Sequence, residues 1–159
     1  FWMAQTYSGY LQKMYDPKWI LKFDDDWMDS VNQRRAAAKA LADHQGHLSE
    51  VDEHQSDLEP IDEVLDFFET VGFYVAGEQM SAEVVHHHLF HWLRGYWCAS
   101  RTYVEAWQRK EALRWEHVAA LYDTTAEIEA KREGIRKEKV LLDPQQAREF
   151  IEEELRLPG

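Results

Sequence analysis

The sequence predicts an all-α fold, a single-domain bundle of five or six helices without significant β-sheet. Residues 61–71 and 82–108 carry most of this prediction, because both segments place apolar side chains at helical spacing. The chain also has only 7 glycines and 4 prolines in 159 residues, and no stretch of convincing length alternates apolar and polar residues as a half-buried strand does. A chain of this length fits one domain with its own core.

Three regions are expected along the chain: an N-terminal helical, juxtamembrane-like segment over residues 1–23, a helical core domain over residues 24–134, and a C-terminal helix over residues 135–159. In the first region, apolar residues keep helical spacing from Met3 to Met14, before Asp16-Pro17 interrupts the pattern. Aspartates at positions 24–26 then predict the start of a helix over residues 27–43. Its inward residues should be Trp27, Met28, Val31, Ala38, Leu41 and Ala42, and its outward residues Arg34, Arg35 and Lys39.

A polar loop is expected over residues 45–57, with His44, His47 and His54 in or beside it. Ser56 and Glu59 have the spacing of a capping box for the next helix, and Pro60 suits its first turn. Gly72 is expected to end that helix in a left-handed conformation. The apolar side of the helix comprises Ile61, Val64, Leu65, Phe68 and Val71, and the polar side comprises Asp62, Glu63, Asp66, Glu69 and Thr70.

The helix over residues 82–108 should begin after Ser81, whose side chain suits an N-cap, with Glu83 in the first turn. His86, at the margin of the apolar side, is expected to be a hydrogen-bonded core histidine. That apolar side comprises Val85, Leu89, Trp92, Leu93, Tyr96, Trp97, Tyr103 and Trp107. Its aromatic residues could form a stacking platform for a cofactor or a base, but a stripe at helical spacing is more typical of a core.

The remaining segments complete the predicted bundle. The connection over residues 73–80 should turn Phe73, Val75 and Met80 inward. From Trp115 the helical pattern resumes and continues to about Glu133, just before Gly134. Asp143-Pro144 with Gln146 is a start signal for the last helix, whose apolar side comprises Phe150, Ile151 and Leu155.

Acidic residues are concentrated in one stretch, which indicates the partners that the chain can bind. Between residues 40 and 93 there are twelve Asp and Glu and no Lys or Arg, so this stretch carries the whole net charge of -12. The 18 acidic and 18 basic residues elsewhere cancel. Such a surface repels phosphate backbones and anionic lipids, which disfavours nucleic acid and favours a protein partner with a basic surface. Seven histidines in the same stretch should offset part of this charge below neutral pH.

The chain contains the segments IDEVLDFFETVGF over residues 61–73, EVV and HWLRGYW starting at Glu83 and His91, and WEHVAALY over residues 115–122. Together these segments resemble an uncharacterised bacterial helical family, domain-of-unknown-function family 4760. Members of that family are small helical proteins that often carry an N-terminal membrane helix ahead of a soluble domain. The resemblance, which covers roughly residues 27–122, implies the helical fold and a membrane anchor in a segment absent from this chain. It implies no catalytic residue.

A histidine-rich helix face is the strongest candidate for a metal site. His87 and His91 lie one helical turn apart, a spacing that can chelate a divalent ion, and Glu83 one turn earlier could supply a third ligand. His88 with His91 is an alternative pair. Either pair would need a further ligand from the loop between His44 and His54. The competing interpretation is a solvated polar face, because no H-E-x-x-H or clustered cysteine motif accompanies the histidines.

Cys98 and two arginines on the same face are weaker candidates. As the only cysteine, Cys98 excludes an internal disulfide or an all-cysteine metal site, and His91 two turns away is too distant for a catalytic dyad within this helix. Arg94 and Arg101 could hold an anionic ligand, but ion pairing with neighbours such as Glu105 is the simpler interpretation. The sequence contains no Gly-rich phosphate loop and no G-x-S-x-G motif.

We therefore expect a non-enzymatic helical interaction or accessory module with no cofactor and no catalytic residue. It would be the soluble part of a membrane-anchored bacterial protein, located in the cytoplasm or at the cytoplasmic face of the inner membrane. Formation of a homo-oligomer stays open. The alternative is a metal-dependent hydrolase or metal sensor that binds a divalent metal through Glu83, His87 and His91.

Overall fold

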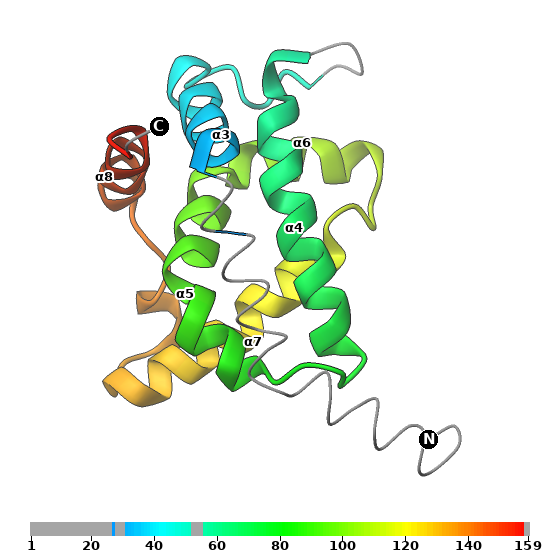
Figure 1. The fold of residues 1–159 in the computed structure, drawn as a ribbon, viewed down its shortest axis with the longest axis vertical. Coiled ribbons are helices and arrows are strands. Elements are labelled where there is room, and N and C mark those ends of the chain that lie inside the picture. Colours follow the sequence, from blue (N-terminus) through cyan, green and yellow to red (C-terminus); the bar gives the residue numbers. More distant parts are fainter. Residues whose placement is uncertain (1–26, 28–30, 52–55, 158–159) are drawn as a thin grey trace.

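Two helices rich in aromatic residues, α4 (Glu59–Ala76) and α5 (Ala82–Ala99), run through the middle of the molecule (Figure 1). The computed structural model describes residues 27, 31–51 and 56–157. Within these residues the chain forms six α-helices and no strand, which confirms the predicted all-α class. The other helices are α3 (Val31–Asp43), α6 (Arg101–Lys110), α7 (Glu116–Glu133) and α8 (Pro144–Leu155), with short 3₁₀ segments at Ser56–Leu58 and Lys137–Lys139.

Predictions for residues 1–26, for Met28 and for His54 lie outside the described residues. None of the helices in the described part of the chain combines the length and the apolar character needed to cross a bilayer.

The central helices α4 and α5 are joined mainly by the elements that lie across them. In Figure 1, α7 crosses both helices and α3 packs against α4; α8 contacts both α3 and α5. Aromatic rings fill the space between the two helices, since the Trp27 ring centroid lies 5.0 Å from that of Phe68 and 5.9 Å from that of Tyr96. The buried Phe150 and Ile151 of α8 belong to the same core.

Gly72 lies within α4, so the prediction that it ends this helix is wrong. A Cβ atom added at Gly72 would lie 2.4 Å from the carbonyl oxygen of His117 at the start of α7. Glycine is therefore required because it lets two backbones touch, and the helix continues to Ala76. The capping box predicted for Ser56 and Glu59 does not form either, although Pro60 lies in the first turn as predicted.

The single helix predicted over residues 82–108 is divided at Ser100 into α5 and α6. The Ser100 hydroxyl donates a hydrogen bond to the carbonyl oxygen of Tyr96, four residues earlier. Back-bonding of this kind often bends a helix, and the Ser100 side chain is fully buried where the bend occurs. After the bend, Tyr103 and Trp107 are buried as predicted.

Three predicted helix ends are confirmed. The Ser81 hydroxyl oxygen accepts a hydrogen bond from the Val84 amide at 3.4 Å at the start of α5. Asp143 and Gln146 form a reciprocal capping box at the start of α8, with bonds of 2.8 and 3.0 Å. Gly134 ends α7 with a φ of 66°. Each signal depends on residues a few positions apart, which is why sequence alone identifies it.

Arg34 and Phe73 lie opposite to their predicted positions. Arg34 was expected to face outward but is 1% exposed, because it pairs with the buried Glu154 carboxylate of α8. Phe73 was expected to turn inward but is 57% exposed. Because α4 continues past Gly72, helical geometry places Phe73 on the side facing away from the core residue Phe68. Met80 is buried as predicted.

Candidate functional site

The three predicted metal ligands are exposed on α5, as expected for one polar face. Glu83 accepts a hydrogen bond from the Ser81 hydroxyl at 3.0 Å, the His87 ring lies 4.8 Å from that of His88, and the His91 ring lies 5.4 Å from that of Phe150. Among the residues that the structure describes, no three His, Cys, Asp or Glu side chains are placed to hold a metal ion. Metal binding by Glu83, His87 and His91 stays a prediction.

The loop histidines lie at a different place. His44 and His47, together with Glu50 and Asp57, line a cavity of about 220 Å³ that neither His87 nor His91 lines. Successive three-residue turns place these loop side chains on one side, since the His47 amide donates to the His44 carbonyl and the Glu50 amide to the His47 carbonyl. The His47 ring also lies 3.2 Å from a Glu50 carboxylate oxygen.

Replacing His87 and His91 together with alanine tests the metal interpretation. Because both side chains are exposed, we expect the free energy of unfolding to change by less than about 0.5 kcal/mol. Calorimetric titration of the tag-free protein with zinc should then show no stoichiometric submicromolar site in the parent. If the parent does bind zinc in this way, and binding is lost in this variant but kept in His44→Ala/His47→Ala, the metal-dependent alternative replaces the non-enzymatic one.

His86 is a hydrogen-bonded core histidine, which confirms its prediction. It is buried, and its Nε2 lies 2.8 Å from a Glu129 carboxylate oxygen near the end of α7. Its ring also lies 4.9 Å from that of Phe90. The pair therefore attaches α7 to α5 and leaves little of His86 for a ligand.

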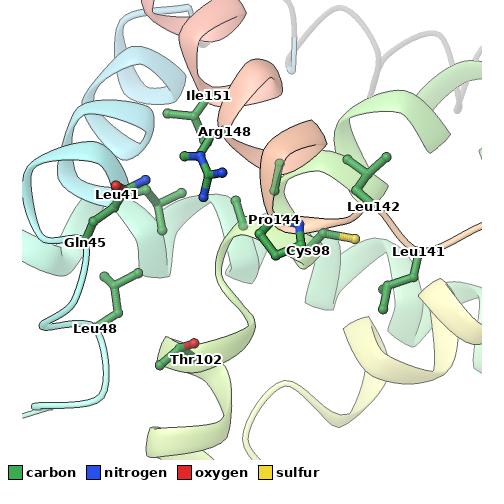
Figure 2. A pocket seen from close by; sticks show the side chains of 12 residues that line it. Leu41, Gln45, Leu48, Cys98, Thr102, Leu141, Leu142, Pro144, Arg148 and Ile151 are labelled. Carbon is green, nitrogen blue, oxygen red and sulfur yellow. The ribbon is translucent and has the colours of Figure 1, made fainter.

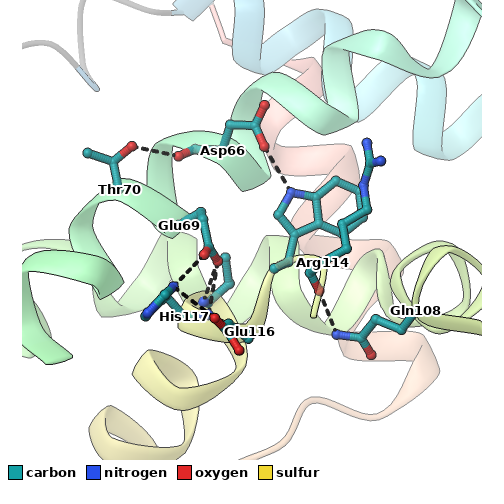
Figure 3. Close-up of polar contacts among 9 residues, drawn as sticks. Asp66, Glu69, Thr70, Gln108, Arg114, Glu116 and His117 are labelled. Carbon is teal, nitrogen blue, oxygen red and sulfur yellow. Dashed lines mark hydrogen bonds and ion pairs between the residues drawn. The ribbon is translucent and has the colours of Figure 1, made fainter. Parts of the chain in front are cut away.

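Two carboxylates of α4, Glu69 and Asp66, bond to residues at the start of α7, which sequence patterns did not predict (Figure 3). Glu69 accepts hydrogen bonds from the backbone amides of His117 and Val118 at 3.0 and 3.1 Å, and its second oxygen lies 2.6 Å from Nδ1 of His117. A carboxylate at this position satisfies amide groups that the first turn of α7 leaves open. Asp66, one turn earlier, accepts a bond of 2.9 Å from the Trp115 indole.

Asp62, one further turn towards the start of α4, also bonds to residues from later in the chain. Its carboxylate accepts a hydrogen bond of 2.6 Å from the Tyr103 hydroxyl and lies 3.6 Å from the Arg114 guanidinium. Burial raises the pKa of Asp62, although the bond from Tyr103 and the charge of Arg114 oppose this. Arg114 itself lies between two indoles, 4.1 Å from the Trp107 centroid and 4.6 Å from that of Trp115. Asp62 and Arg114 are therefore both engaged by other side chains of the protein.

A second polar network links α3, α5 and α8 inside the core. Arg34 donates two hydrogen bonds to the Glu154 carboxylate at 3.0 and 2.9 Å, and the Tyr96 hydroxyl donates to the same carboxylate at 2.8 Å. The guanidinium also lies 4.9 Å and 5.3 Å from the ring centroids of Trp27 and Trp92. Burial, assisted by the Glu154 charge, raises the pKa of Tyr96. These groups are too inaccessible to meet a substrate.

Cys98 is half-buried, and its environment disfavours the reactive thiolate. Burial raises the pKa of the thiol, and the opposing influence of the Leu142 backbone, Arg101 and Arg94 does not compensate. A protonated thiol is a poor nucleophile. The charge of Arg94 favours the thiolate but is outweighed by burial.

Other acidic side chains remain on the surface at the start of α4. Asp57, Glu59 and Glu63 are exposed, and we call these three residues the acidic edge. Asp57 lies in the short 3₁₀ segment just before α4. Glu59 and Glu63 lie at the start of α4, one helical turn apart. The acid-rich stretch thus separates into carboxylates that hold helices together and carboxylates that face solvent.

Sequence reasoning missed the intramolecular roles of Arg34, Glu154 and the α4 carboxylates. The signal available was the three-to-four-residue spacing of Asp62, Asp66 and Glu69, but no local pattern indicates their distant partners. No family model, curated protein sequence or solved structure matches the chain.

Proposed function

We propose that the chain is a non-enzymatic interaction module that binds a basic protein segment through the acidic edge. The observation that carries this proposal is the exposure of Asp57, Glu59 and Glu63 within a stretch that contains no Lys or Arg from residue 40 to residue 93. Exposed carboxylates of one sign attract a cationic surface and accelerate its association.

The roles of the other ionisable groups support a binding module. The pairs of Arg34 with Glu154, Glu69 with His117, and His86 with Glu129 each join two helices. Such groups position secondary structure and are already engaged with one another. The acidic edge, in contrast, consists of exposed side chains whose charge is directed at solvent.

The negative charge of the acidic edge limits the kind of partner that can bind there. A second copy of this chain would present the same acidic edge, so self-association through this surface would place like charges together. DNA, RNA and anionic lipid carry the wrong sign. We therefore propose a different protein with a Lys- and Arg-rich surface. On the resemblance to the bacterial helical family, we further propose that the module acts beside the inner membrane, attached by a segment outside this chain.

The test compares two charge-reversed variants that have equal net charge. In Glu59→Lys/Glu63→Lys the acidic edge is reversed, and in Glu149→Lys/Glu153→Lys two exposed glutamates of α8 at the same spacing are reversed. Binding of a fluorescent Lys- and Arg-rich peptide is followed by anisotropy. The two Glu→Lys changes alter the charge of the acidic edge by four units. At about 0.3–0.5 kcal/mol for each unit, binding to the first variant should weaken about tenfold.

Added salt should weaken peptide binding to the parent, because the attraction between exposed charges is screened. The α8 variant should retain most of the parent affinity. The proposal fails if both variants lose affinity equally, since net charge alone would then explain binding. It also fails if a DNA duplex binds the parent protein and the complex persists at high salt.

A further inference from the structure

A cavity of about 400 Å³ opens between α3, α8 and the bend that separates α5 from α6 (Figure 2). Its walls are mainly aliphatic and include Leu41, Leu48, Leu142 and Ile151. Ligand cavities in proteins usually measure about 300–1,000 Å³ and combine apolar walls with a few polar groups. This cavity is at the small end of that range, which suits a compact molecule.

Among the residues that the structure describes, Arg148 is the only charged one that lines the cavity. It is exposed, and its guanidinium donates a hydrogen bond of 2.9 Å to the neutral amide oxygen of Gln145, which leaves its charge uncompensated by that contact. In a chain with a net charge of -12, a cavity whose single charge is positive is distinctive. Arginine at the edge of an apolar wall can bind a carboxylate through two parallel hydrogen bonds.

Two further arginines act on the wall of this cavity. The charges of Arg101 and Arg94 both favour the thiolate form of Cys98, which lines the cavity. Arg101 lies 3.3 Å from Glu105 on the surface, and Arg94 donates a weak bond of 3.5 Å to the Val140 carbonyl. Both arginines therefore act on a negative charge placed beside Cys98, although Arg101 is also paired with Glu105.

We propose that this cavity binds a small amphiphilic anion, a medium-length aliphatic carboxylate. Its carboxylate binds the Arg148 guanidinium, and its chain packs against Leu41, Leu48 and Ile151. The ligand is held without a covalent step. This site is separate from the acidic edge, so each can fail its test while the other stands.

Cys98 provides the measurement, because it is the only cysteine in the chain and lines the cavity (Figure 2). Octanoate is used as the probe, and the rate at which neutral iodoacetamide alkylates Cys98 is followed in the full chain. Octanoate should slow alkylation about fivefold or more, with an apparent Kd of about 1 mM or lower, as expected for a ligand of this size. Acetate, which has the same head group without the chain, should have no effect.

Variants on α8 separate the charge from the apolar wall. Arg148→Gln should weaken octanoate protection about tenfold, which corresponds to the loss of a charge-assisted contact. Arg156→Gln, which changes an exposed arginine just after α8 and outside the cavity lining, should leave protection unchanged. Ala147→Phe, which places a ring in the cavity, should remove protection; circular dichroism establishes that each variant is folded.

Three results would overturn the proposal. One is the absence of protection by octanoate at concentrations below micelle formation. Another is an equal loss of protection in Arg148→Gln and Arg156→Gln. The third is protection by octanol that equals protection by octanoate, because the cavity would then select for the chain alone.

Discussion

Replacing Arg34 with methionine is expected to lower the free energy of unfolding by about 3–5 kcal/mol. Methionine fills much of the same space but leaves the Glu154 carboxylate buried without the guanidinium that donates two hydrogen bonds to it. The side chains of both residues are almost fully inaccessible, so water cannot replace the lost partner. Urea unfolding followed by tryptophan fluorescence measures the difference.

The matched control is Lys39→Met on the same helix. Lys39 pairs with Asp43 at 2.9 Å, but both side chains are exposed, so its loss should cost less than about 1 kcal/mol. The double variant Arg34→Met/Glu154→Leu should recover much of the stability, because no charge is then left unpaired. Equal losses in Arg34→Met and Lys39→Met would show that the buried pair does not stabilise the fold.

Replacing Phe68 with alanine is expected to cost about 3–5 kcal/mol, because it leaves a large cavity between the central helices. Phe68 is 0% exposed, and its ring centroid lies 5.0 Å from that of Trp27 and 5.2 Å from that of Phe67. The sequence pattern places Trp92, like Phe68, on the apolar side of its helix. Trp92 is only half-buried, however, so Trp92→Ala should cost less. Urea unfolding again provides the values.

Phe73 supplies the control within the same helix. It makes ring contacts with Tyr74 and His117 but is 57% exposed, and Phe73→Ala should cost about 1 kcal/mol or less. If Phe68→Ala and Phe73→Ala cost the same, the assignment of the inner and outer sides of α4 is wrong.

Sequence reasoning predicted the features that depend on short spacings. The all-α class follows from apolar periodicity, and the ends at Ser81, Gly134 and Asp143 follow from capping chemistry within a single turn. His86 was also assigned correctly, because its position at the margin of an apolar side already implies a buried ring that needs a hydrogen-bond partner.

The errors share a different physical origin. Arg34 is a good helix former and was placed outward, yet its carboxylate partner lies 120 residues away, beyond the reach of any local pattern. Gly72 was assigned a local turn because the close approach of α7 leaves no mark in the neighbouring residues. The α4 carboxylates were counted as surface charge because their donors, Tyr103 and Trp115, come from later parts of the chain.

The contact between Gly72 and His117 also has a consequence for recognising distant relatives. A chain that shares this junction must keep a glycine where α4 meets α7, and the glutamate one turn before it gains its role only if the later helix begins at the matching place. Exposed neighbours such as Phe73 carry no such requirement. A search for homologues can therefore pair E-x-x-G, at Glu69 and Gly72, with W-x-H, at Trp115 and His117.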